Sequence, residues 1–131
     1  MILLDTCALL WLASAQEKLG KETLKIIETA PVVYVSAISG FEIGIKTRVG
    51  KLRLPVPARQ WFDSIVEHHD LTIIDLDIIT CIHATELPPI HRDPCDRFVI
   101  ATALERELSV VTGDKHFEAY GVKVLLANSR S

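Results

Sequence analysis

Cysteine is scarce in this sequence, and its three copies lie far apart. Cys7, Cys81 and Cys95 form no CxxC pair, and their number is odd. The sequence therefore predicts neither a disulfide framework nor a zinc site. Reduced thiols in a cytoplasmic protein are the simplest interpretation.

Long hydrophobic runs and an excess of positive charge are also missing. The longest apolar run covers residues 7–13, far short of the roughly 18 residues that a membrane helix needs. No basic residue opens the chain, so we expect neither a secretory signal nor a membrane anchor. The formal net charge of −3 excludes a generally basic nucleic-acid-binding surface, but it is compatible with a local basic patch.

Apolar side chains, by contrast, are plentiful. Hydrophobic residues make up 49% of the 131 residues and charged residues 24%, which predicts a single folded domain spanning residues 1–131. The mean hydropathy of +0.28 is high for so small a chain. We therefore expect part of the apolar surface to meet a partner or a second copy.

Short apolar strands alternate with helical patterns along the chain. This order predicts right-handed crossovers and a three-layer α/β/α sandwich around a mainly parallel sheet. Only residues 128–131 look like a loose tail. The expected strands are residues 2–4, 32–35, 71–74, 109–112 and 122–126, and the expected helices are about residues 6–13, 21–29, 37–49, 58–69, 77–86 and 94–107.

Two acidic residues follow predicted strands directly. Asp5 comes after the first strand, and Asp114 comes after the strand that ends at Thr112. Open parallel sheets bind ligands beyond the carboxyl ends of their strands, so both positions favour a functional site. Each residue has an ordinary alternative, because Asp5 also suits the N-cap of the next helix and Asp114 suits the N-cap of a short loop segment.

Two further acids lie on helix faces that should be buried. Glu42 shares the predicted apolar face of Ala37, Ile38, Phe41 and Ile45. Asp96 precedes Val99, Ile100 and Ala103 by three, four and seven residues. The alternatives are a Glu42 that reaches water, and an Asp96 that suits the helix dipole behind an Asp93 cap and Pro94.

Together the four acids predict a metal centre. If Asp5, Glu42, Asp96 and Asp114 converge, their like charges repel, and a divalent cation removes that conflict. With only oxygen ligands and no histidine or cysteine expected nearby, Mg²⁺ or Mn²⁺ is favoured over zinc. Such ions activate water and neutralise phosphate charge, which points to phosphodiester hydrolysis.

Polar and basic residues near these acids suggest the substrate. Thr6 and Thr112 could add hydroxyl contacts, or they are ordinary threonines at a helix start and a strand end. Five basic residues without an intervening acid suit a nucleic-acid backbone, unless they form a solvated face. They are Lys46, Arg48, Lys51, Arg53 and Arg59, and Arg92 and Arg97 could join them.

Four segments resemble the PIN-domain ribonucleases, specifically the VapC-type toxins of bacterial toxin–antitoxin pairs. They are Leu3-Leu4-Asp5-Thr6 with Leu10-Trp11, Ser36 to Ser39 with Glu42-Ile43 and Lys46, His91 to Arg97 with Ile100-Ala101, and Thr112-Gly113-Asp114. The resemblance implies an acidic site of Asp5, Glu42, Asp96 and Asp114 and an Mg²⁺- or Mn²⁺-dependent endoribonuclease that arrests translation. It also implies a homodimer, inhibition by a cognate antitoxin and a larger complex with it. Cys95 departs from the subgroup, where a bulkier apolar residue is common.

Two other functions start from the same residues. A phospho-acceptor signalling domain is also a small parallel α/β fold with an acidic Mg²⁺ pocket, but Asp75 is its only candidate acceptor here. A catalytically inactive PIN-like binding module would hold a partner without metal chemistry. The retained acids argue against it, because they would be buried without partners.

Overall fold

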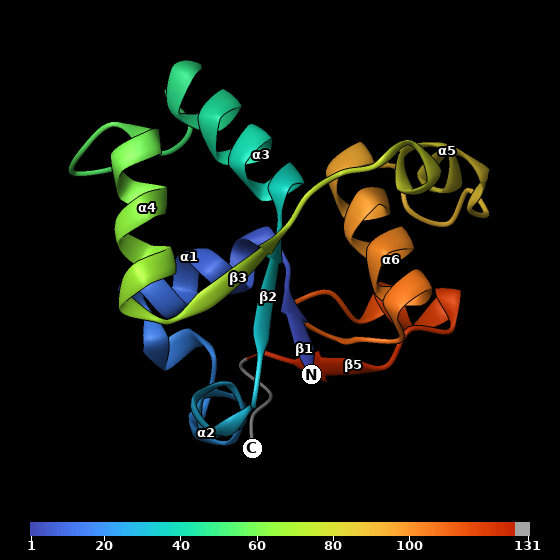
Figure 1. The fold of residues 1–131 in the computed structure, drawn as a ribbon, viewed down its shortest axis with the longest axis horizontal. Coiled ribbons are helices and arrows are strands. Elements are labelled where there is room, and N and C mark those ends of the chain that lie inside the picture. Colours follow the sequence, from blue (N-terminus) through green and yellow to red (C-terminus); the bar gives the residue numbers. More distant parts are fainter. Residues whose placement is uncertain (128–131) are drawn as a thin grey trace.

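The structure, a computed structural model, describes residues 1–127, so the predicted tail at 128–131 lies outside the described residues. Its strands form one parallel sheet in the order β3-β2-β1-β4-β5 (Figure 1). The strands are β1 (Ile2–Leu4), β2 (Val33–Ser36), β3 (Leu71–Ile74), β4 (Ser109–Thr112) and β5 (Val124–Leu126). The α-helices are α1 (Thr6–Ser14), α2 (Lys21–Thr29), α3 (Ala37–Arg48), α4 (Ala58–His68), α5 (Ile78–Glu86) and α6 (Pro94–Arg106). The prediction of a three-layer α/β/α sandwich is confirmed, with a sheet that is parallel throughout.

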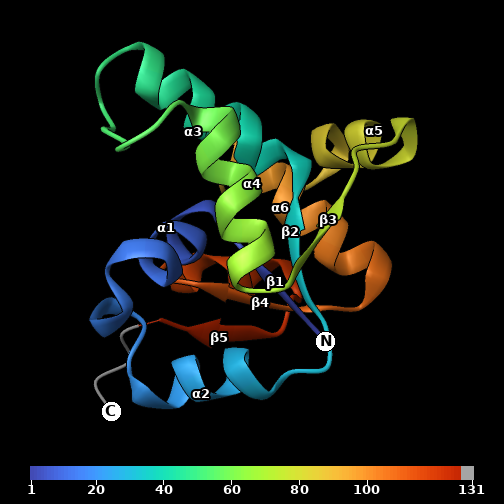
Figure 2. The same ribbon diagram turned by 60° about the vertical axis from the view of Figure 1, so that its left-hand side comes forward.

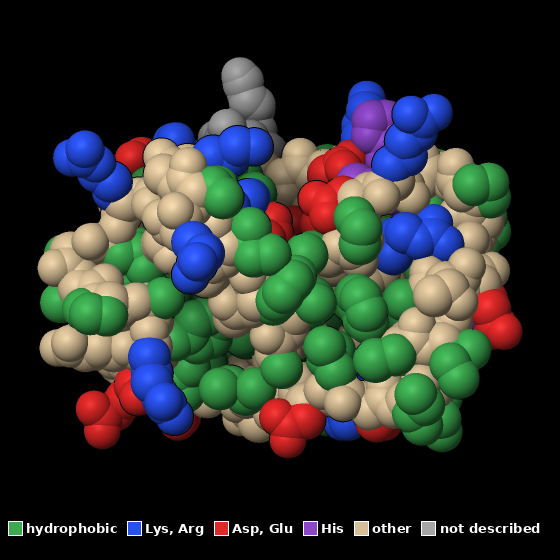
Figure 3. Space-filling model, turned by 90° about the horizontal axis from the view of Figure 1, so that it is seen from above, with side chains coloured by type: hydrophobic (Ala, Val, Ile, Leu, Met, Phe, Trp, Pro, Cys, Tyr) green, Lys and Arg blue, Asp and Glu red, His purple; other side chains and the backbone are tan. Residues whose placement is uncertain are grey.

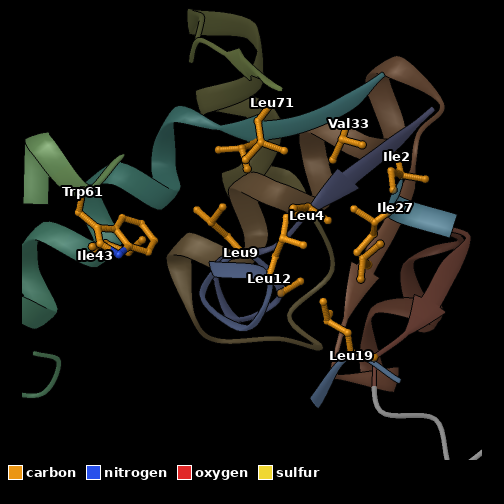
Figure 4. Close-up of a cluster of buried hydrophobic side chains, with 14 residues drawn as sticks. Ile2, Leu4, Leu9, Leu12, Leu19, Ile27, Val33, Ile43, Trp61 and Leu71 are labelled. Carbon is orange, nitrogen blue, oxygen red and sulfur yellow. The ribbon is translucent and has the colours of Figure 1, made fainter. Parts of the chain in front are cut away.

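Helices cover the sheet on both sides (Figure 2). Because successive strand residues point to opposite faces, Ile2 and Leu4 of β1 pack into one cluster and Leu3 into the other. The first cluster, drawn in Figure 4, joins the sheet to α1, α2 and α4. The second joins it to α5 and α6. Burial on both faces explains why the central strands are continuous apolar runs instead of alternating ones.

Polar caps start the helices that lead away from the strand ends. The Asp5 side chain accepts a hydrogen bond from the Ala8 N–H at the start of α1, and Ser36 does the same for Ile38 at the start of α3. Asp93 caps α6 in the same way, with Pro94 in the first turn. These short-range signals are why the sequence places most elements within one or two residues of their observed ends.

The predicted buried face of α3 is right at Ile38, which is 6% exposed, but wrong at its two other large apolar residues. Phe41 is 60% exposed and Ile45 is 45% exposed, whereas Ser39 and Ile43 are fully buried. Ser39 packs α3 against α1 through a 2.8 Å hydrogen bond between its hydroxyl and that of Thr6. Phe41 and Ile45 thus face outward although both are large and apolar, a result that a hydrophobicity pattern cannot show.

The structure also has two short 3₁₀ helices, η1 (Gln16–Lys18) and η2 (Lys115–Tyr120), which are not among the expected elements. Asp114 caps η2 by accepting from the His116 N–H, as its alternative interpretation expected. Across residues 1–127, no helix is both long enough and apolar enough to cross a membrane.

Candidate acidic centre

The site begins where the central strands β1 and β4 end side by side. The parallel register pairs Leu4 with Val111, and the Asp5 N–H donates to the Val111 carbonyl at 3.1 Å. Asp5 and Asp114 therefore leave the sheet at the same edge. The Asp5 side chain is almost fully buried, at 5% exposed, while one of its oxygens caps α1. The cap uses one carboxylate oxygen, so it is compatible with the predicted place of Asp5 at the acidic centre.

Helix α3 brings a third carboxylate to this edge. The Glu42 side chain is 12% exposed, and its Oε2 accepts from Lys46 Nζ at 2.9 Å. Among the described residues, Glu42 Oε1 is buried without a hydrogen-bond partner. An unpartnered buried carboxylate oxygen is costly, so a ligand is the expected solution for this atom.

Helix α6 and the turn after β4 supply the remaining acids, with a histidine between them. His91 Nε2 lies 3.1 Å from Asp96 Oδ2 and 2.9 Å from Asp114 Oδ2. One potential ligand atom from each of the three residues lies within 4.8 Å of the others, which is compatible with a shared metal ion.

Burial and mutual repulsion shift the acids at this edge. Burial raises the pKa of Asp5 to about 6, against hydrogen bonds from Thr112 and Ala8, and the charges of Glu42 and Asp114 raise it further. Burial, followed by the charges of neighbouring carboxylates, raises the pKa of Asp96 to about 7 although His91 opposes the shift. The charge of Glu42 contributes to both raised pKa values, and the charge of Asp114 contributes to that of Asp5.

Asp114 behaves differently because it is better hydrogen-bonded. Burial raises its pKa, but the His116 N–H and the side chains of His91 and His116 outweigh that effect, so the pKa of Asp114 is lowered overall. The folded structure therefore stabilises the charge of Asp114, whereas Asp5 and Asp96, whose pKa values are raised, gain from a nearby cation.

A family model described as "PIN domain" matches residues 2–123. The chain belongs to the PIN domain family. It is 28% identical over 120 residues to "Ribonuclease VapC22" of Mycobacterium tuberculosis (strain ATCC 25618 / H37Rv), with 91% of each chain covered.

Solved structures share the fold of this PIN domain. The VapBC2 structure from Rickettsia felis, bound to a DNA fragment from its promoter, gives a TM-score of 0.73 at 16% identity and covers 98% of this chain and all of the other. DNA-bound VapBC from Salmonella typhimurium gives 0.67 at 18% identity, with 95% and 98% covered. FitAcB from Neisseria gonorrhoeae gives 0.65 at 22% identity, with 95% and 96% covered.

The donor set of this PIN domain fits a divalent cation. Glu42 Oε1 has no partner among the described residues, and buried Asp5 carries a raised pKa, so both side chains gain from a positive charge. The expectation that no histidine or cysteine lies nearby is wrong. His91 lies among the acids. Cys7 and Cys95 are also near, because burial raises the pKa of each thiol to about 11 and the charges of Glu42 and Asp96 add to that rise. Mg²⁺ and Mn²⁺ prefer carboxylate oxygens to thiols, so the acids stay the expected ligands.

The two predicted threonines are buried inside the site and support its walls. Thr6 is bonded to Ser39, and the Thr112 hydroxyl accepts from the Asp114 N–H at 3.0 Å. Gly113 lies between Thr112 and Asp114, and a Cβ at this position would come within 2.8 Å of the Trp11 ring. The Thr112-Gly113-Asp114 turn is thus shaped by packing as well as by its hydroxyl.

The predicted basic residues differ in whether their side chains are bonded within the protein. Lys46 forms an ion pair with Glu42. The exposed side chains are those of Arg48, Lys51, Arg53, Arg59 and Arg92. Arg97 is committed, because its guanidinium donates to backbone carbonyls from Ala84 to His91. Figure 3 looks onto this edge of the molecule, where acidic side chains and a histidine gather with Lys and Arg around them.

His91 is the residue of this site that sequence reasoning missed, although it stands in the His91–Arg97 motif. Its position depends on contacts with residues 5 to 29 positions further along the chain, which no local pattern shows. Asp75, the acceptor of the phospho-acceptor alternative, is exposed at the end of the edge strand β3 and does not join the cluster. Nothing in the geometry favours that alternative.

Proposed function

We propose that this PIN domain is an Mg²⁺- or Mn²⁺-dependent endoribonuclease, the toxin of a VapBC-type pair. In the cytoplasm it would cleave RNA, inhibit translation and be neutralised by its antitoxin. The observation that carries the proposal is the convergence of buried carboxylates at the strand ends, with Glu42 Oε1 unpartnered among the described residues. The similarity to a protein named as a VapC ribonuclease supports the choice of RNA.

Asp5, Glu42, Asp96 and Asp114 would hold the metal. When bound, Mg²⁺ or Mn²⁺ lowers the pKa of a coordinated water and neutralises charge on the phosphate under attack. The chain's own contribution is pre-organisation. The α1 cap fixes the Asp5 carboxylate, and Thr112 fixes the backbone of Asp114.

Basic side chains next to the acids would hold the RNA. Lys46, Arg48 and Arg92 lie close to the acidic residues in sequence, and Arg48 and Arg92 are exposed. Phosphate contacts of this kind position a strand without reading its bases. Because single-stranded and looped RNA exposes its backbone to such a surface, we expect it to be the substrate. Arg97 is left out of this surface because its donors are engaged within the protein.

Exposed apolar side chains provide surface for protein partners. Phe41 and Ile45 on α3 and Ile78, Ile79 and Ile82 on α5 are at least 45% exposed, and a band of hydrophobic side chains crosses the face in Figure 3. We assign the exposed apolar side chains of α3 and α5 to a contact with a second copy of the chain, and the acidic centre to an antitoxin segment, with a larger complex of both. Toxin–antitoxin complexes among the structures of the same fold support the antitoxin.

The decisive experiment is RNA cleavage by the purified chain. Wild type with Mn²⁺ should release fragments from total RNA, and Asp96→Asn or excess EDTA should abolish cleavage. Asp75→Asn is the matched control, since it removes an exposed carboxylate from a strand end outside the cluster and should keep full activity. Unchanged cleavage in EDTA or in Asp96→Asn would refute the metal mechanism, and no cleavage of any RNA by wild type would favour the inactive module.

The second copy is tested by mass in solution. Light scattering should give twice the monomer mass for wild type, and Ile79→Glu should give a folded monomer, because a charge cannot be buried in an apolar interface without a partner. A monomeric wild type would refute the proposed dimer and leave the proposed nuclease activity unaffected.

A further inference from the structure

Hydrogen bonds hold both the N–H and the carbonyl of His91, although the residue lies in a loop. Its N–H donates to the Tyr120 hydroxyl at 2.6 Å, and that hydroxyl donates to the Pro88 carbonyl at 2.8 Å. Its carbonyl accepts from Arg97 Nη1 at 3.0 Å, and Arg97 also binds the carbonyls of Pro88 and Leu87. The backbone of His91 is therefore fixed on both sides by side chains from η2 and α6.

The imidazole ring is fixed as well. It packs edge-on against Phe117, with ring centroids 5.6 Å apart and planes at 82°. Its side chain is only 15% exposed, although it belongs to the connection between α5 and α6. So many constraints on one ring indicate that the direction of its nitrogens matters.

The hydrogen bonds assign the proton on that ring. The Asp93 N–H faces Nδ1 at 3.3 Å, so Nδ1 carries the lone pair, and the proton of the neutral ring lies on Nε2. Nε2–H is then directed at Asp114 Oδ2 and Asp96 Oδ2. A ring that used Nε2 as a metal ligand would need its proton on Nδ1, pointing at the Asp93 N–H, which is repulsive. The geometry thus favours a donor over a ligand.

We propose that His91 is the positioning residue of the acidic centre: its Nε2–H bridges Asp96 and Asp114 and holds the two carboxylates at metal-binding spacing. One carboxylate comes from α6 and the other from the turn after β4, and no hydrogen bond between described residues links them directly. Each carboxylate keeps other lone pairs for a cation while it accepts from Nε2–H. The role is that of an outer partner that orients metal ligands, and it rests on the proposed function.

The test compares two histidines that bond the same carboxylate. His91→Phe keeps the ring shape and removes the donor, and His91→Gln restores an N–H near the same point. His116→Phe is the matched control, because His116 also bonds Asp114, at 2.8 Å, but is 72% exposed. Mn²⁺ affinity, followed by electron paramagnetic resonance of the free ion, should fall about 10- to 100-fold in His91→Phe, as for other outer-partner losses. It should stay near wild type in His116→Phe and recover partly in His91→Gln.

Nitrogen-15 NMR of the imidazole in wild type provides a readout that needs no variant. In this spectrum the metal-free protein should show the proton on Nε2. Electron paramagnetic resonance of the Mn²⁺ complex should show no coupling to a directly bound ring nitrogen. A proton on Nδ1, direct nitrogen coupling to Mn²⁺, or wild-type affinity in His91→Phe would each overturn the proposal. If wild type takes up no Mn²⁺ at all, the proposed function fails together with it, whereas normal uptake with an unaffected His91→Phe refutes the role of His91 alone.

Discussion

Replacing Asp5 with Asn should stabilise the metal-free protein at alkaline pH, although it removes a central residue of the site. Burial raises the pKa of Asp5 from 3.8 to about 6. This rise in pKa corresponds to about 3 kcal/mol against the ionised form of Asp5 in the folded state. Asn keeps the oxygen that caps α1 but weakens the contact with Thr112, which costs about 1 kcal/mol. We therefore expect a net gain of about 2 kcal/mol at pH 8.

The sign of the pH dependence follows from the same shift. Below pH 3.8 the carboxyl is protonated in the folded and the unfolded chain, so burial carries no penalty. As pH rises to about 6 the unfolded chain ionises first, and the stability that Asp5 contributes is lost. Wild type should therefore weaken between these values more than Asp5→Asn does. Asp96, whose pKa is raised to about 7, keeps part of the slope in both proteins.

The assay is urea unfolding with a chelator at pH 5 and pH 8. Asp114→Asn is the control with the opposite sign, because the pKa of Asp114 is lowered and its charge stabilises the folded state at high pH. It should lose stability at pH 8 where Asp5→Asn gains it. An Asp5→Asn protein that is no more stable than wild type at pH 8, with the same slope, would refute the view that this carboxylate is buried at a cost.

Three other substitutions test the surroundings of the site. Arg97→Lys should lower the free energy of unfolding by about 2–3 kcal/mol because several of its carbonyl bonds are lost, with KM for RNA unchanged. Unchanged stability with a raised KM would instead place Arg97 on the RNA surface. Gly113→Ala should cost about 1–3 kcal/mol through its clash with Trp11, and adding Trp11→Leu should recover most of the loss. Additive losses in urea unfolding would exclude that clash. Lys46→Ala should tighten Mn²⁺ binding, since it removes a cation bonded to Glu42, and should raise KM for RNA. Weaker Mn²⁺ binding in calorimetry would contradict this.

Local signals explain what could be predicted from the sequence. A capping Asp5 or Ser36, the Asp93-Pro94 pair and β-branched runs act within a few residues, so the elements and their order were accessible. The exits of β1 and β4 then placed Asp5 and Asp114 at one edge. The family resemblance and the spacing led to the same four acids. Two of them, Asp96 and Asp114, lie together with His91 in the structure, and the four as one metal site stay a prediction.

Contacts between distant residues explain what could not be predicted. Helix α3 packs against α1 through a hydroxyl pair between Ser39 and Thr6 and leaves Phe41 and Ile45 exposed, so a face chosen by hydrophobicity alone comes out partly wrong. Arg97 is a basic residue of the kind that binds RNA, but its guanidinium binds backbone carbonyls that come within reach only when α5 ends beside α6. The ring of His91 likewise needs η2, which the sequence did not predict.

The most direct measurement is a calorimetric titration of Mn²⁺ into the purified chain and into Glu42→Gln. Glu42 Oε1 is the buried oxygen that lacks a partner among the described residues, and Gln replaces the carboxylate with a neutral group of the same shape. We predict saturable binding by wild type and binding at least about 10-fold weaker in Glu42→Gln. No saturable heat in wild type, or identical isotherms for the two proteins, would contradict the claim that these carboxylates form a metal centre.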